Sequence, residues 1–272
     1  MSEIKETREE WVTRVVSMYE KDTKERVRQY LTEYFKSNRG SVLRNIASLP
    51  KSRGLKSLFI DGDLSGLKQN FYVASKLTMA SQLETNPRVD VFGAYQPFLY
   101  GLLSDSPEII DWLAHTELKD KDYIKCPHFL FSQFQLVLQQ DDAALRETIA
   151  VVAKKGGNGD KALSAAGTDF FSLLLKRDKE ALQTLIENAA KIKSADEYVG
   201  QFLAGYAVIL AKLCWLRGIE VDIKNPLVPM PMLPVRPLDS YDLEYDFLRP
   251  DWTPPQPSMV EKFKRWFKPK GA

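Results

Sequence analysis

The feature that most constrains the fold of this chain is a weak internal repeat marked by aspartate. The stretch around Asp141 aligns with the stretch around Asp178 at an offset of 37 residues. The same frame recurs upstream at Asp63 and Asp105, which makes the earlier spacings 42 and 36 residues. Periods in this range are typical of stacked helical hairpins, because a two-helix unit needs neighbours to bury both of its apolar faces.

Each repeat has the pattern of a helix, a tight corner and a second helix. A large apolar residue lies three positions before each aspartate, and others follow four and eight positions after it. An aspartate at the corner can accept hydrogen bonds from the free N–H groups of the second helix. At one corner, Ser106 and Pro107 add a capping residue followed by proline. The alternative interpretation is that four amphipathic helices begin with aspartate by coincidence.

Apolar periodicity predicts helices along most of the chain and no sheet. We expect Pro50 to end the second helix, Gly156–Gly159 to be a flexible connection, and Ser194 with Glu197 to form a capping box. Residues 219–223 alternate in polarity and could form one short strand. Helices are expected at residues 4–36, 41–49, 64–83, 96–103, 107–115, 129–140, 142–154, 161–176, 179–192 and 195–217.

The composition changes after Gly218. Residues 219–257 hold nine of the 15 prolines, a density that forbids regular helix. The same segment is rich in large apolar residues, which a disordered linker would not carry. The sequence therefore predicts an all-α body of stacked antiparallel helical hairpins over residues 1–218. It also predicts a proline-rich extended arm packed on that body over 219–257 and a short basic amphipathic tail over 258–272.

Bulk properties favour a cytoplasmic protein. The net charge of +2 provides no global field for nucleic acid. Two distant cysteines, Cys126 and Cys214, indicate a reducing compartment and no disulfide framework. The charged N-terminus does not predict a secretory signal, and no stretch has the roughly 20 apolar residues of a membrane span.

Candidate chemical groups are few, and we predict no enzyme, no metal and no cofactor. Cys126 and His128 lack the further ligands or orienting partner that a zinc site or a nucleophile needs. The glycines at 156–159 lack the GK[ST] ending of a phosphate-binding loop. The carboxylate pairs Asp61/Asp63 and Asp141/Asp142 are already explained by helix capping.

One stretch of the predicted arm combines acidic and aromatic residues. Aromatic side chains supply buried area in an interface, and carboxylates steer the approach of a basic partner. The alternative is that the aromatic rings pack inward and the acids are simply solvated. As partner contacts we predict Tyr241, Asp242, Glu244, Tyr245 and Asp246.

Several stretches of the chain are similar to a family of known proteins. They are residues 61–77, 99–110, 169–178, 212–221 and above all 226–248. Together they resemble the immunity-49 family of bacterial polymorphic-toxin immunity proteins. The resemblance implies an all-α protein that binds a cognate toxin, secreted between competing bacteria, and blocks it in the cytoplasm of the producing cell. The family offers no motif of functional residues to carry over, so the resemblance does not locate the interface.

An enzyme that reverses a toxin's modification would need a convergent polar pocket, which the sequence does not indicate. Two other kinds of function remain in view. The first is an immunity protein that binds and neutralises one cognate secreted antibacterial toxin, with neither nucleic acid nor a membrane span involved. The alternative is a helical-repeat adaptor or chaperone that binds several protein partners. One nanomolar partner would favour the first, and several micromolar partners would favour the second. The sequence leaves the oligomeric state and the activity of the toxin open.

Overall fold

The chain is described by a computed structural model that covers residues 6–32, 38–84, 91–192 and 198–253. These residues form twelve α-helices and three short 3₁₀ turns, and none of them lies in a strand. The prediction of an all-α fold is therefore confirmed, and the possible strand at 219–223 is not formed. The expected capping box at Ser194–Glu197 and the tail at 258–272 lie outside the described residues.

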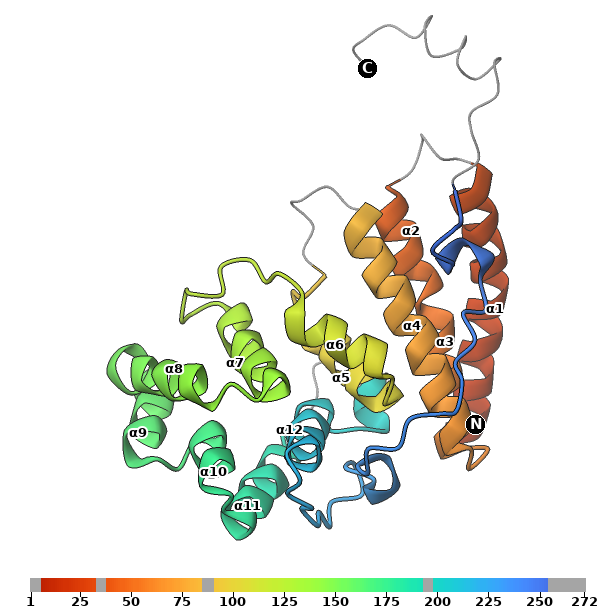
Figure 1. The fold of residues 1–272 in the computed structure, drawn as a ribbon. Coiled ribbons are helices and arrows are strands. Elements are labelled where there is room, and N and C mark those ends of the chain that lie inside the picture. Colours follow the sequence, from red (N-terminus) through yellow and green to blue (C-terminus); the bar gives the residue numbers. More distant parts are fainter. Residues whose placement is uncertain (1–5, 33–37, 85–90, 193–197, 254–272) are drawn as a thin grey trace, which may run out of the picture.

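The first four helices form an upright bundle at one end of the molecule (Figure 1). They are α1 (Arg8–Thr32), α2 (Arg39–Ile46), α3 (Ser48–Phe59) and α4 (Leu64–Glu84). The prediction that Pro50 ends a helix is wrong, because Pro50 lies in the first turn of α3. The first-turn N–H groups of a helix have no intrahelical partner, so proline is tolerated there without losing a hydrogen bond.

The next helices pair into hairpins that follow one another along an arc (Figure 1). Within the hairpins, α5 contacts α6, α7 contacts α8, and α10 contacts α11, just as α3 contacts α4 in the first bundle. Contacts between α4 and α5, α6 and α7, and α8 and α10 join successive hairpins. These helices are α5 (Gln96–Ser104), α6 (Pro107–His115), α7 (Pro127–Gln139), α8 (Asp142–Lys155), α9 (Asn158–Ala166), α10 (Phe170–Lys176) and α11 (Lys179–Ala189).

Three of the four repeat aspartates cap the helix that follows them. Asp63, Asp141 and Asp178 accept hydrogen bonds from the N–H groups of Gly66, Ala144 and Ala181, at 2.9, 2.9 and 3.1 Å. The expectation that Asp105 does the same is wrong. Ser106 is the cap of α6, and its Oγ lies 3.5 Å from the N–H of Ile109. Asp105 ends α5 in a left-handed conformation and is fully buried.

Two helices predicted as continuous are interrupted. The stretch 161–176 divides into α9 and α10 at Gly167, whose φ of +67° ends α9. The stretch 195–217 is reduced to a 3₁₀ turn at Val199–Gln201 and to α12 (Gly205–Leu216). Its interruption has a tertiary cause, because the N–H of Ala204 donates to the carbonyl of Leu227, 2.8 Å away in the following segment.

One cluster of buried apolar residues extends from Val12 in α1 to Leu248. α12 lies in the middle of the molecule between α5 and α7 on one side and α11 on the other (Figure 1). Nine of its residues are buried, among them Lys212. The segment after α12 contributes Ile219, Val221 and Ile223 to the same cluster. We call residues 219–253, the described part of the predicted arm, the arm.

Candidate functional site

The arm runs from the end of α12, past the lower part of the molecule, and up along the α1–α4 bundle (Figure 1). Its first part is bonded to α11 and α12. The Trp215 side-chain N–H donates to the carbonyl of Val221 at 3.2 Å, and the backbone N–H of Asp222 donates to Gln183 Oε1 at 3.0 Å. Body side chains therefore satisfy arm backbone groups that no helix or sheet satisfies.

Tyr241 is the first predicted contact residue along the arm, and it is half-buried. Its hydroxyl donates to the carbonyl of Ser104 at 2.7 Å and accepts from the N–H of Leu238 at 3.1 Å. Its ring centroid lies 4.7 Å from that of Tyr72 in α4. Burial raises the pKa of Tyr241. This side chain therefore anchors the arm, and only part of its surface is open to a partner.

Asp242 is held through its backbone and exposes its carboxylate. Gln69 of α4 donates to the carbonyl of Asp242 at 2.7 Å and accepts from its N–H at 3.1 Å. One carboxylate oxygen also accepts from the N–H of Glu244 at 3.0 Å. Two bonds from one amide fix the backbone here, so the carboxylate is presented at a defined place.

Glu244 turns the arm toward α1 and α3. Its φ of +62° is a left-handed conformation, and its carboxylate lies 3.0 Å from Arg53 of α3. Arg53 also contacts Glu20 of α1 at 3.1 Å. Glu244 and Tyr245 line a groove of about 510 Å³ between α1, α3 and the arm. The negative charge of Glu244 is therefore partly neutralised by Arg53.

Tyr245 and Asp246 complete the predicted set. The Tyr245 ring is stacked on Phe247 with centroids 5.1 Å apart, and burial raises the pKa of its phenol. Asp246 is exposed and lies 3.1 Å from Arg249. Phe247 is buried against Tyr30 of α1, with ring centroids 4.8 Å apart. The two predicted tyrosines thus pack partly inward, whereas the carboxylates of Asp242 and Asp246 face solvent.

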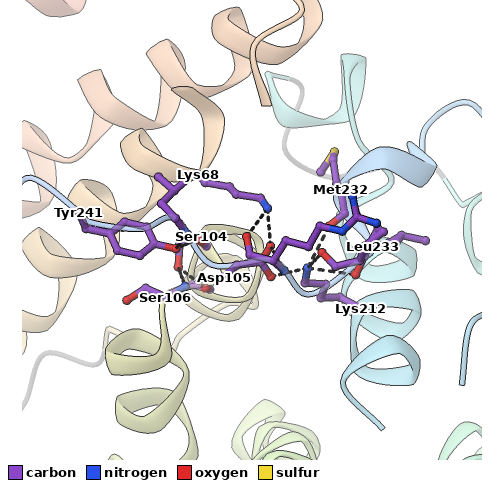
Figure 2. A network of polar contacts seen from close by, with 12 residues as sticks. Lys68, Ser104, Asp105, Ser106, Lys212, Met232, Leu233 and Tyr241 are labelled. Carbon is purple, nitrogen blue, oxygen red and sulfur yellow. Dashed lines mark hydrogen bonds and ion pairs between the residues drawn. The ribbon is translucent and has the colours of Figure 1, made fainter. Parts of the chain in front are cut away.

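Sequence reasoning missed a buried ion network beside this segment, shown in Figure 2. The fully buried Asp105 lies at its centre. Its two carboxylate oxygens lie 2.5 Å from Lys212 Nζ of α12 and 2.8 Å from Lys68 Nζ of α4. Lys212 has no exposed surface and Lys68 is 4% exposed. Two ammonium groups therefore share one carboxylate inside the core.

Backbone groups of the arm complete this network. Lys212 Nζ donates to the carbonyls of Met232, Leu233 and Pro234 at 3.0, 3.1 and 3.2 Å. Lys68 Nζ donates to the carbonyl of Arg236 at 2.6 Å, and the N–H of Arg236 donates to Asp105 Oδ2 at 3.3 Å.

Burial lowers the pKa of Lys212, and the nearby Asp105 carboxylate opposes this effect. A lysine inside the otherwise apolar run 207–214 is the one sequence signal that could have indicated this network.

The cysteine and histidine considered above do come together. Cys126 Sγ lies 3.0 Å from His128 Nδ1 at the start of α7. Among the described residues, no group of three or more His, Cys, Asp or Glu is placed to hold a metal ion. Within the same part of the chain, no helix is long and apolar enough to cross a membrane.

A cavity of about 360 Å³, lined by polar and apolar side chains, lies between α2, α3, α4 and α5. Arg44 and Ser75 are among the described residues that line it. Arg44 donates to Ser41 Oγ at 2.8 Å and to Ser81 Oγ at 2.9 Å. Its guanidinium therefore links α2 to α4, which gives it a structural role in the first bundle.

Part of the chain resembles a known protein family. Residues 108–232 match the family model described as Immunity protein 49. The matched region runs from α6 through α12 to Met232 in the arm. It includes Lys212 but neither Lys68 nor Asp105. No curated protein and no solved structure matches the chain. Over residues 108–232, a little under half of its length, the chain is therefore similar to the immunity-49 family of immunity proteins.

Proposed function

We propose that this protein binds a cognate secreted antibacterial toxin in the cytoplasm of the producing cell and blocks it by direct contact. The observation that carries this proposal is the match of residues 108–232 to Immunity protein 49. The all-α architecture supports it, because stacked helical hairpins offer a rigid, shaped surface for docking.

We further propose that the toxin contacts the acidic and aromatic stretch of the arm. Tyr241 and Tyr245 are half-buried, so their rings offer apolar surface that is already fixed in place. The exposed carboxylates of Asp242 and Asp246 lie on either side of Tyr245 and Glu244. Such a surface suits a toxin with a basic face, because opposite charges speed the encounter and aromatic anchors hold the complex.

Co-expression with the toxin encoded beside this protein tests the function itself. We expect the immunity protein to restore growth to cells that the toxin would otherwise kill, and to form a complex with a nanomolar Kd. A toxin that stays fully active in the presence of excess immunity protein would refute the proposal. Micromolar binding to several unrelated proteins would favour the adaptor or chaperone instead.

Charge substitutions test the surface. Asp242→Asn together with Asp246→Asn removes two exposed charges and retains side-chain shape. We expect a several-fold slower association with the toxin and a weaker dependence of the association rate on salt, because long-range attraction is lost. Asp178→Asn, at the exposed corner where α11 begins and outside the stretch 241–246, is the matched control. If only the control slows association, the toxin binds at the hairpin corners and not at the arm.

A further inference from the structure

We infer that Lys68, Asp105 and Lys212 are positioning residues: they hold residues 232–242 of the arm in the single conformation that presents Asp242 and Tyr245 to the toxin. This inference rests on the proposed function, and it adds that buried groups without any toxin contact determine how well the toxin binds. Figure 2 shows these side chains converging from α4, from the corner between α5 and α6, and from α12.

The contacts between this network and the arm are made to the arm backbone. Lys212 binds three successive carbonyls, and the N–H and carbonyl of Arg236 are bound by Asp105 and Lys68. Pro234 and Pro237, on either side of residues 235–236, have no N–H to donate, which disfavours a regular hydrogen-bonded structure of the arm itself here. Its conformation is therefore imposed by side chains of the helical body.

The restraint continues to the predicted contact residues. Beyond Arg236, the Tyr241 hydroxyl donates to Ser104, the residue that directly precedes Asp105. Gln69, the neighbour of Lys68 on α4, then fixes both backbone groups of Asp242. The corner at 104–105 and the helical turn at 68–69 thus bind the arm on both sides of Leu238, and any shift of Asp105 is transmitted to Asp242.

The charges make the network and the docked arm depend on one another. Two ammonium groups and one carboxylate leave one surplus positive charge in a buried place. Buried charge is tolerated only when further hydrogen bonds satisfy it, and here the arm carbonyls of residues 232–234 and 236 provide them. An undocked arm would leave both lysines short of acceptors. The arm is therefore held in place before the toxin arrives, which lowers the entropy lost on binding.

Lys68→Met tests this inference in the full chain. The substitution keeps the aliphatic stem, leaves Asp105 and Lys212 as a neutral pair, and removes the bond to the Arg236 carbonyl. We expect amide hydrogen exchange over residues 235–242 to become at least about tenfold faster, because that stretch opens more often. The matched control is Lys76→Met on the same helix. Lys76 Nζ lies 2.6 Å from the carboxylate of Glu108, which belongs to α6 and not to the arm. In the Lys76→Met variant, we expect amide hydrogen exchange over residues 235–242 to match that of the native chain.

A second variant keeps the test decisive if Lys68→Met does not fold. Lys212→Met leaves Lys68 and Asp105 as a neutral pair and removes the bonds to the carbonyls of Met232, Leu233 and Pro234, so we expect faster exchange over residues 232–236. Unchanged exchange in whichever of these variants fold would overturn the inference.

Toxin binding supplies the second measurement. We expect Lys68→Met to raise the Kd about tenfold while Lys76→Met leaves it unchanged, since only the first loosens the contact surface. Faster exchange with an unchanged Kd would overturn the link between the network and binding. If the native chain binds no toxin at all, the proposed function fails, and the exchange experiment still shows whether the network holds the arm.

Discussion

At the scale of single residues, Asp105 and Asp178 occupy equivalent positions in the repeat but meet different surroundings. Asp178 is exposed and caps α11 through the N–H of Ala181. Asp105 has no exposed surface and binds two lysines. The left-handed conformation at Asp105, with φ of +56°, lets aspartate end α5 while its carboxylate points into the core. Ser106 takes over the capping role.

The difference predicts unequal stability changes for the same substitution. Asp105→Asn should lower the free energy of unfolding by about 3–5 kcal/mol, because it leaves two buried ammonium groups without a counter-charge. Asp178→Asn should change it by less than about 0.5 kcal/mol, since asparagine caps helices as well as aspartate does. Urea unfolding followed by circular dichroism measures both values. Equal losses in the two variants would contradict a special role for Asp105.

The two thiols should differ in reactivity. Cys214 is fully buried in α12, and burial raises its pKa to about 12. Cys126 is partly exposed at the start of α7. The thiolate is the reacting species and must be reached by the reagent. We therefore expect a thiol reagent at pH 8 to label Cys126 quickly and Cys214 only when the protein unfolds. Cys126→Ser should abolish the fast phase, and a fast phase that persists in this variant would show that Cys214 is accessible.

The raised pKa of Cys214 also predicts a loss of stability in alkali. The thiol loses its proton near pH 9 in the unfolded chain and near pH 12 in the folded chain. Its contribution to stability is therefore fully present below pH 9 and is lost as the pH rises toward 12. Urea unfolding at pH 8 and pH 10 should show that the free energy of unfolding falls more between these two pH values in the native chain than in Cys214→Ala. Identical slopes would argue against a buried, protonated thiol.

At the scale of elements, the junction between α9 and α10 depends on a glycine. Gly167 has φ of +67°, and an added Cβ would lie 2.6 Å from Lys176 Nζ. That neighbour is the flexible end of a side chain, so the main penalty comes from the left-handed backbone.

We expect Gly167→Ala to destabilise the protein by about 1–2 kcal/mol. Gly159→Ala is the control, because Gly159 lies in α9 with open space around an added Cβ. This control should stabilise by up to about 1 kcal/mol. Thermal unfolding of the two variants measures the difference, and a shift of the same sign in both would refute the assignment of the break to Gly167.

At the scale of the whole molecule, the family match and the buried network have different boundaries. The match covers residues 108–232, whereas Lys212 draws its partners from Asp105 and from residues 232–234. Helices α4 and α5 also form part of the core around α12.

We therefore expect a fragment of residues 108–232 to lack a cooperative thermal transition, because it would bury Lys212 without a carboxylate. Circular dichroism and differential scanning calorimetry test this, with the full chain as reference. A sharp transition with native-like helicity in the fragment would show that the matched region folds independently of the rest. The division of the chain at residues 218 and 257 stays a prediction from composition.

The sequence by itself determined the helical class and the hairpin corners at Asp63, Asp141 and Asp178. These follow from spacings of three, four and about 37 residues, which act through hydrogen bonds and apolar faces within one or two helices.

Only the tertiary structure decided that Asp105 turns inward, that α12 begins as late as Gly205, and which faces of Tyr241 and Tyr245 remain open. Each of these depends on groups that meet across the fold, such as Ala204 with Leu227 and Ser104 with Tyr241. Local spacing carries no record of such contacts, because they are set by how the helices and the arm pack together and by where a buried charge finds its acceptors.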